Sequence, residues 1–100
     1  SLIPFKNQTQ QNNYSSQIIS IYPNPVINEF SIDFYSVANE KIQFVYYDVL
    51  GNILFQTDIR SEINGKASIS NLNADLPTGV YYVGMIVNGE VVDAKKMMVK

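Results

Sequence analysis

The sequence predicts an all-β protein, an immunoglobulin-like β-sandwich of about seven antiparallel strands. Three observations support this prediction. Short runs of β-branched and aromatic residues recur along the chain, with apolar and polar side chains alternating as they do in half-buried strands. Turn-forming Gly, Pro, Asn and Asp residues separate these runs. No segment keeps a 3.6-residue apolar period for longer than a turn or two, so helices are not expected.

The composition of the chain excludes several classes of function. Its 100 residues are enough for one domain with a hydrophobic core. It has no cysteine, which excludes disulfides and thiolate metal sites, and no histidine, the commonest general base. A formal net charge of −2 argues against a nucleic-acid binder. No apolar run reaches the roughly 20 residues of a membrane-spanning helix, so no membrane insertion is expected.

Residues 1–16 have the composition of a linker. The stretch at residues 7–13 is polar, uncharged and aperiodic, and it buries too little apolar surface to offset the entropy of ordering it. The short apolar cluster at residues 2–5 suits either the end of a preceding domain or a short edge strand docked on this one. We expect a piece of a longer protein, with a linker in residues 1–16 and one domain in residues 17–100.

The first strand of this domain is expected to lead into a stiff corner. Ile18, Ile19 and Ile21 suggest the strand, and Tyr22-Pro23-Asn24-Pro25 follows it directly. Each proline keeps the residue before it out of the helical region and cannot donate a hydrogen bond to a sheet. The corner is therefore expected to close a strand or lie at a sheet edge, and to redirect the chain toward the next strand.

Two alternating strands and a hairpin come next. Residues 30–35 alternate apolar and polar side chains, and residues 41–49 form another strand after a loop. This second strand ends in Asp48-Val49-Leu50-Gly51-Asn52. The Asp48 carboxylate can accept a hydrogen bond from the backbone two residues on, and Gly51 or Asn52 can take a positive φ. The segment is therefore expected to be a hairpin turn into a return strand at residues 53–59.

The rest of the chain is expected to hold a short strand, suggested by Ala67, Ile69 and Leu72 and ending in the turn region of residues 71–75, and then a final pair of strands. Pro77 and Gly79 make the turn before this pair, because Pro77 fixes its own φ and Gly79 can take φ > 0. Asn88-Gly89 separates the two strands and predicts that they are antiparallel neighbours. Gly84 interrupts the first of them, which marks a bulge or a close approach of the backbone. The alternation assigns most of the core to Ile32, Phe34, Phe44, Tyr46, Tyr81, Val83 and Met85.

Three short segments together carry a resemblance to a known family. They are Tyr22-Pro23-Asn24-Pro25, the Tyr46-Tyr47-Asp48-Val49-Leu50-Gly51 hairpin, and Leu76-Pro77-Thr78-Gly79-Val80-Tyr81. In order and spacing they resemble the C-terminal sorting domain of the type IX secretion system, type A, over residues 20–100. The family's hairpin reads Ile-Tyr-Asp-x-x-Gly. Tyr46 stands at its first position here, a departure that keeps size and β propensity.

The resemblance implies a sorting signal without chemistry of its own. Such domains stand last in proteins exported across the outer membrane of Bacteroidetes-type Gram-negative bacteria. A sortase-like peptidase then usually removes the domain by cutting in the linker before it, and the cargo is released or attached to the surface. The implied protein partners are the outer-membrane secretion machinery and this peptidase, with no cofactor. The implied destination is the cell surface or the medium, reached through the periplasm.

The C-terminal segment adds basic residues to the candidate recognition site. Lys95, Lys96 and Lys100 are three of the seven basic residues in an acidic chain. They suit either guards of an edge strand, with residues 97–99 holding that strand in place, or a compact basic patch on a flexible end that attracts an acidic receptor. The family closes with a basic, apolar tail of this kind. The predicted recognition residues are Tyr22, Pro23, Asn24, Pro25, Asp48, Gly51, Leu76, Pro77, Gly79, Tyr81, Lys95, Lys96 and Lys100.

Two alternative functions belong to other classes. An enzyme is not expected, because the carboxylates fall mostly at turns and strand ends, and no phosphate loop, nucleophile elbow or metal-ligand spacing is present. A carbohydrate-binding or adhesive module is the other alternative, with Tyr35, Tyr47 and Tyr82 as an outward aromatic face, although the chain has no tryptophan. A calcium site at residues 48–52 is conceivable, but turn chemistry alone accounts for those residues.

Overall fold

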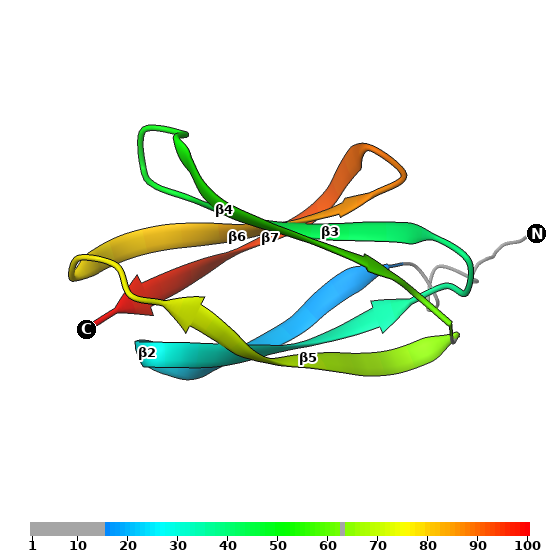
Figure 1. Cartoon of the computed structure of the whole chain (residues 1–100), viewed down its shortest axis with the longest axis horizontal. Coiled ribbons are helices and arrows are strands. Elements are labelled where there is room, and N and C mark those ends of the chain that lie inside the picture. Colours follow the sequence, from blue (N-terminus) through cyan, green and yellow to red (C-terminus); the bar gives the residue numbers. More distant parts are fainter. Residues whose placement is uncertain (1–15, 63) are drawn as a thin grey trace, which may run out of the picture.

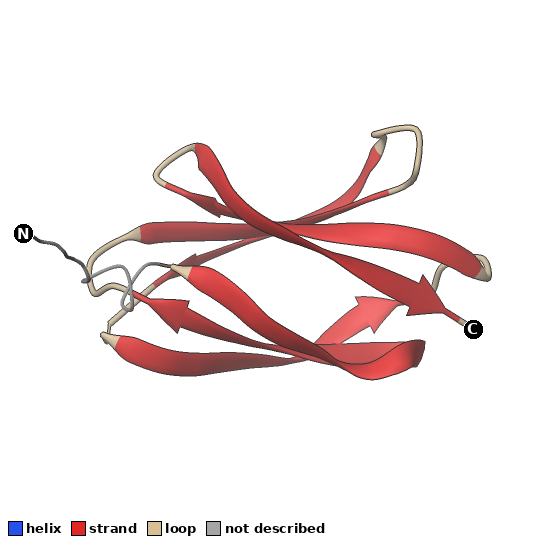
Figure 2. Cartoon of the chain, turned by 180° about the vertical axis from the view of Figure 1, so that it is seen from behind, coloured by secondary structure: helices blue, strands red, loops and turns tan. Residues whose placement is uncertain are grey.

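A computed structural model describes residues 16–62 and 64–100, in which every regular element is a strand (Figure 2). The strands are β2 (Gln17–Ser36), β3 (Lys41–Tyr47), β4 (Ile53–Arg60), β5 (Gly65–Ala74), β6 (Gly79–Val87) and β7 (Glu90–Val99). Figure 1 shows two stacked layers, with β3, β4, β6 and β7 in the upper layer and β5 in the lower one. The predicted all-β sandwich is therefore confirmed. The expected linker at residues 1–16 lies, except for Ser16, outside the described residues.

β2 is long because it serves both layers. In Figure 1 it starts at the right-hand end of the molecule, runs to the left-hand end and returns to the right. Val26 pairs with Val99 of β7, whereas Asn28 opens the pairing with β5. The chain therefore reverses directly after Pro25, where Asn28 takes a φ of 69° that Asn tolerates better than most residues. The corner therefore redirects the chain as predicted. When the two halves of β2 are counted as separate strands, the sandwich has the seven strands that were expected.

The layers are built mainly from antiparallel pairs. The strand order is β4-β3-β6-β7-β2-β5, with the first half of β2 beside β7 and the second half beside β5. Only the short contact between β2 and β7 is parallel among the pairs of the described strands. Because β7 lies between β6 and β2, the interpretation of its lysines as guards of an edge strand is wrong. The ends of the order are β4 and β5.

The core lies between the two layers and confirms the predicted alternation. All seven residues expected there are buried. Phe34 of β2 meets Phe44 of β3 edge to face, with ring centroids 5.1 Å apart, and the tilted rings of Phe30 and Tyr46 make a second contact between the layers at 5.2 Å. The seven expected core residues did not include any from the first half of β2 or from the C-terminal strand. These further core residues are Ile18, Ile21, Val26, Met97 and Val99.

Two predicted hairpins are confirmed, and one local prediction is wrong. Asn88 and Gly89 both have positive φ, 51° and 88°, as the two-residue turn between β6 and β7 requires. Gly79, in contrast, does not take a positive φ and simply begins β6. β5 ends at Ala74, within the turn region of residues 71–75 where this strand was expected to end, and a register shift opposite Phe30 and Ile32 keeps it paired with β2.

Gly84 shows neither of the two roles expected for it. The shift in the β6–β7 ladder falls between Met85 and Ile86, so Gly84 itself is not the bulge. A Cβ atom added at Gly84 would lie 3.4 Å from a methyl of Val45 and 3.5 Å from the ring of Tyr47. These are ordinary van der Waals distances to side chains, so no unusually close approach of the backbone requires a glycine here.

Candidate recognition surface

Three of the four segments with predicted recognition residues meet at one end of the sandwich. These are the β2 corner, the turn before β6 and the end of β7, at the left-hand end in Figure 1. We define the convergent end as residues 22–28, 74–82 and 95–100. Segments from the two ends of the described chain thus form one surface, although more than 70 residues separate them in sequence.

The β2 corner holds the C-terminus through hydrogen bonds. The backbone N–H of Met98 donates to Asn24 Oδ1 at 3.1 Å, and the N–H of Lys100 donates to the carbonyl oxygen of Val26 at 2.9 Å. The Asn24 side chain thus supplies the acceptor for an N–H group of β7 at this point in the corner. The C-terminal strand is therefore fixed by the corner, contrary to the expectation of a flexible end.

The turn before β6 is closed by Tyr81. Its hydroxyl donates to the carbonyl oxygen of Pro77 at 2.6 Å, while the N–H of Leu76 donates to the carbonyl oxygen of Ala74 at 2.8 Å. The Tyr81 ring lies along Gly79, where an added Cβ would be 3.8 Å from a ring carbon. Gly79 pairs with Val99, so this turn lies directly beside the end of β7.

Tyr22 links the corner to the outer face of the lower layer. Its hydroxyl donates to Asp33 Oδ1 at 2.9 Å, and the Ser68 hydroxyl donates to the same oxygen at 2.6 Å. These hydrogen bonds, with that from Ser68 the stronger, lower the pKa of the Asp33 carboxyl. The bond to the Asp33 carboxylate raises the pKa of Tyr22, because ionised Tyr22 could not donate it. Asp33 therefore stays ionised and orients the Tyr22 ring.

The hairpin containing Asp48 and Gly51 is the fourth segment, and its polar contacts are internal. Asp48 Oδ1 accepts from the N–H groups of Leu50 at 3.0 Å and Asn52 at 2.9 Å, and Oδ2 accepts from Asn52 Nδ2 at 3.0 Å. Gly51 takes the positive φ expected of it, 89°. The Asn52 side chain, followed by the backbone donors, lowers the pKa of Asp48. These bonds account for the turn geometry of the Asp-x-x-Gly hairpin without an ion.

The comparison with known proteins identifies the family. The profile of the family described as "Secretion system C-terminal sorting domain" matches residues 20–100. The chain belongs to this family. No curated protein matches it. The sorting domain is the C-terminal signal for type IX secretion, and it directs its parent protein across the outer membrane to the cell surface or the extracellular space.

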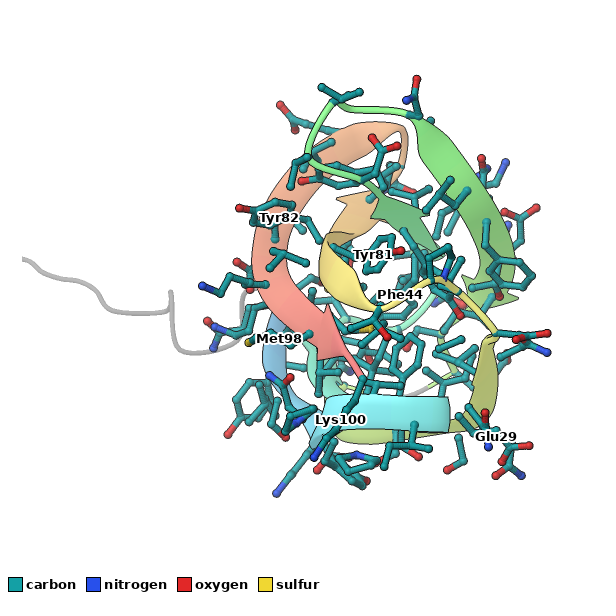
Figure 3. The ribbon with its side chains drawn as sticks, turned by 90° about the vertical axis from the view of Figure 1, so that its left-hand side faces the viewer. Glu29, Phe44, Tyr81, Tyr82, Met98 and Lys100 are labelled. Carbon is teal, nitrogen blue, oxygen red and sulfur yellow. The ribbon has the colours of Figure 1, made fainter. Side chains whose placement is uncertain are left out.

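The sorting domain does not gather its three C-terminal lysines on one face. Successive residues of a strand point to opposite sides, so Lys95 and Lys96 diverge. Lys96 pairs with Tyr82 on the outer face, whereas Lys95 pairs with Val83, whose side chain enters the core. Figure 3 shows Tyr82 and Met98 pointing outward along one side of the molecule, with Lys100 at the end of that side and beside β2.

Met98 also departs from the expectation for the C-terminal segment. Met97 and Val99 are buried and hold the strand in place as expected, but the Met98 side chain is 45% exposed. The outer side of the last residues of the sorting domain therefore presents Lys96, Met98 and Lys100. This surface combines positive charge with an apolar side chain.

Sequence reasoning missed the polar groups that fix the convergent end and the start of β2. Asp33, Ser68 and Asp93 belong to this set, and Asp93 Oδ2 accepts a hydrogen bond of 2.8 Å from the N–H of Ile18. Their partners are distant in sequence, and isolated Asp and Ser residues on strands give no periodic signal. The outward placement of Asp33 in an alternating strand was the one available indication.

Three features of the described residues concern a metal site, a membrane-spanning helix and the outward tyrosines. Within residues 16–62 and 64–100, no group of three or more acidic side chains could hold a metal ion. In the same part of the chain, no helix is long and apolar enough to span a membrane. Tyr47 and Tyr82 stack with ring centroids 5.7 Å apart, so two of the three outward tyrosines contact each other. The family is a non-catalytic signal domain.

Proposed function

We propose that the convergent end of this sorting domain is the surface that the outer-membrane secretion machinery reads, and that the domain itself performs no catalysis. The observation that carries the proposal is the pair of hydrogen bonds from Met98 to Asn24 and from Lys100 to Val26. They join the Tyr22–Pro25 corner and the C-terminus, the two segments most remote in sequence, into one surface. A receptor that contacts both can distinguish a folded domain from an unfolded chain.

The convergent end combines positive charge, which favours encounter with a receptor, and an apolar side chain, which supplies contact after encounter. Lys96 and Lys100 are exposed on the same side of the C-terminal segment, with the exposed Met98 between them. Positive charge on an acidic chain favours productive orientation toward an acidic receptor surface, because complementary charge speeds encounter. Met98 then supplies flexible apolar contact once the surfaces meet. Lys95 contributes to the positive field from the other side of the strand.

The proposal extends to a cut in the linker. Residues 1–16 would connect the cargo to the sorting domain, and a sortase-like peptidase would cut there after export. The family match from residue 20 and the start of β2 at Gln17 support this boundary. The polar, uncharged sequence of residues 7–13 also suits an accessible peptidase substrate.

An export assay with matched charge variants tests the recognition surface. The chain is fused behind a periplasmic reporter in a host with the type IX machinery. Lys95, Lys96 and Lys100 are changed to Gln in one variant, and Lys41, Arg60 and Lys66, which lie outside the convergent end, are changed to Gln in the control. Both variants lose three positive charges. We expect the first to be retained in the periplasm and the control to be exported like the parent.

The assay is interpreted only for variants whose urea melts match the parent, so that loss of export is not loss of folding. Equal export of the two folded variants would show that the lysines are not read. A further Asn24→Ala variant tests the coupling of the corner to the C-terminus. It should speed hydrogen exchange at the Met98 amide and reduce export together. Faster exchange with unchanged export would contradict the claim that the joined surface is what the machinery recognises.

A further inference from the structure

A small polar hollow lies against the corner of β2. It has a volume of about 220 Å³ and is lined by Tyr22, Pro23, Glu29, Phe30, Ser31 and Asn71. The first two of these residues belong to the convergent end, and the others come from the second half of β2 and the end of β5. Figure 3 looks onto this end of the molecule and shows Glu29 at the lower right and Met98 at the left. Glu29 therefore lies across this end from the exposed Met98, beside the proposed receptor surface.

The hollow carries negative charge. Among its six lining residues only Glu29 has a formal charge, and its side chain is exposed. Asp33 lies on the same outward side of β2 as Glu29, because residues two or four apart on a strand share a face, and its carboxylate accepts the hydrogen bond from Tyr22 at 2.9 Å. Lys66, the cation whose charge acts on that carboxylate, pairs with Tyr35, farther along β2 from Glu29. The hollow therefore favours a cationic ligand group.

Tyr22 gives the hollow an aromatic wall. Its side chain is 44% exposed, and the hydrogen bond to Asp33 fixes the direction of its hydroxyl. Donation to a carboxylate makes the phenol ring richer in electrons, which strengthens its attraction for a cation over the ring face. The adjacent Pro23 continues this wall with an apolar ring. The wall therefore suits a flat cationic group better than a compact ion.

A guanidinium group matches this combination of charge, aromatic ring and oxygen acceptors. It is planar, stacks on aromatic faces and donates two parallel N–H bonds to a carboxylate such as that of Glu29. Ser31 and Asn71 line the same hollow and carry side-chain oxygens that can accept its remaining N–H groups. The ammonium group of a lysine carries the same charge, but it is a compact, strongly hydrated ion without a planar face. The chemistry of the hollow therefore favours arginine.

We propose that the hollow beside the β2 corner binds an arginine side chain of the receptor protein in the secretion machinery. This inference deepens the proposed function, and the identity of the partner rests on that function. The convergent end then offers positive charge at Lys96 and Lys100 and, beside it, negative charge at Glu29. A receptor with the complementary pair of charges binds in a defined orientation, whereas charge of a single sign attracts without fixing the orientation.

Export of charge-reversal variants separates this proposal from a general preference for positive charge. Glu29→Lys and the matched control Glu90→Lys change the net charge equally, and Glu90 begins β7 outside the convergent end. A receptor that reads only positive charge would export both variants like the parent. We expect export of Glu29→Lys to fall several-fold and export of Glu90→Lys to stay unchanged, with urea melts of both matching the parent. Undiminished export of the folded Glu29→Lys variant, or an equal loss in the control, would overturn the proposal.

An NMR titration tests the hollow without the export machinery. Nα-acetylarginine amide is added to the isotope-labelled 100-residue chain, and the backbone amide shifts of Glu29, Ser31 and Asn71 are followed. We expect shifts that saturate at these amides. Nα-acetylcitrulline amide, which has nearly the same shape without the charge, and Nα-acetyllysine amide should each bind more weakly. Glu29→Gln should weaken arginine binding roughly fivefold, as for one exposed charge pair, and Glu90→Gln should leave it unchanged.

Equal binding of the citrulline compound would show that the hollow takes neutral polar groups, and equal binding of the lysine compound would remove the role of the Tyr22 ring. Shifts spread evenly over the chain would mean that no site exists. Each of these results would overturn the proposal. The proposed receptor surface fails separately. Saturable arginine binding with normal export of the variant in which Lys95, Lys96 and Lys100 are Gln would refute the role of the lysines and leave the arginine site. Retention of that variant without arginine binding would do the reverse.

Discussion

The hydroxyl of Tyr81 donates a hydrogen bond of 2.6 Å to the backbone carbonyl oxygen of Pro77, four residues earlier. This bond connects β6 to the turn that precedes it and holds that turn beside Val99. The Tyr46 hydroxyl, in contrast, is buried without a hydrogen-bond partner among the described residues. The hydroxyl groups of two tyrosines in the same sandwich therefore contribute to stability with opposite signs.

Tyr81→Phe should destabilise the domain. The substitution keeps the ring in the core but leaves the Pro77 carbonyl without this donor, at a cost of about 1 kcal/mol. Urea unfolding followed by circular dichroism measures the difference. A stability equal to that of the parent would show that the bond adds nothing beyond the packing of the ring.

Tyr46→Phe should stabilise the domain by up to about 1 kcal/mol, because it removes a polar group that is buried without a partner. Burial raises the pKa of Tyr46 to about 12 from the ordinary value of 10.0. The stability linked to this group is fully present below pH 10 and is lost as the pH rises toward 12. The advantage of Tyr46→Phe should therefore grow above pH 10. A loss of stability in this variant would point to a hydrogen-bond partner for the hydroxyl.

Phe44→Ala should cost roughly 3–5 kcal/mol, because it leaves a cavity between the layers where Phe44 meets Phe34. Phe55 is the matched control. It lies on the edge strand β4 and is 42% exposed, so Phe55→Ala should cost only about 1–2 kcal/mol. A loss below about 1 kcal/mol for Phe44→Ala, in the same urea melts, would mean that the core has been assigned to the wrong face.

The Asp48 carboxyl should titrate below its usual range, since hydrogen bonds in the hairpin favour the ionised form. Its contribution to stability is present above the unfolded-state pKa of about 3.9 and is lost as the pH falls through the lower folded-state pKa. Asn52→Ala removes the first of these donors and should move the pKa of Asp48 upward. Carboxyl carbon shifts in an NMR titration give both values. An unchanged pKa in Asn52→Ala would assign the shift to the backbone donors alone.

Local rules on the sequence account for much of the fold. Alternation at residues 30–35 and 41–47 gives the buried face, and Asn88-Gly89 gives the last hairpin, because both signals depend only on neighbouring residues. The Gly79 prediction was wrong for the converse reason. The Tyr81 hydroxyl closes the turn by its hydrogen bond to Pro77, and Gly79 pairs with the distant Val99. A positive φ at Gly79 is therefore not needed.

The arrangement of the candidate site could be predicted only in part. The four motif segments were recognisable, but the convergence of three of them depends on contacts such as that from Met98 to Asn24, across 74 positions of sequence. The neighbours of Gly84 could not be predicted either. Gly84 lies against Val45 and Tyr47 of another strand, and a single sequence does not reveal this contact.

The export of a reporter tests the central claim most directly. The chain is fused behind a periplasmic reporter protein and produced in a host with the type IX machinery and in an otherwise identical host without it. Reporter activity is measured in the periplasm, on the cell surface and in the medium. The account predicts that the reporter reaches the surface or medium only where the machinery is present, and stays in the periplasm where it is absent. The same distribution of a folded fusion in both hosts would contradict it.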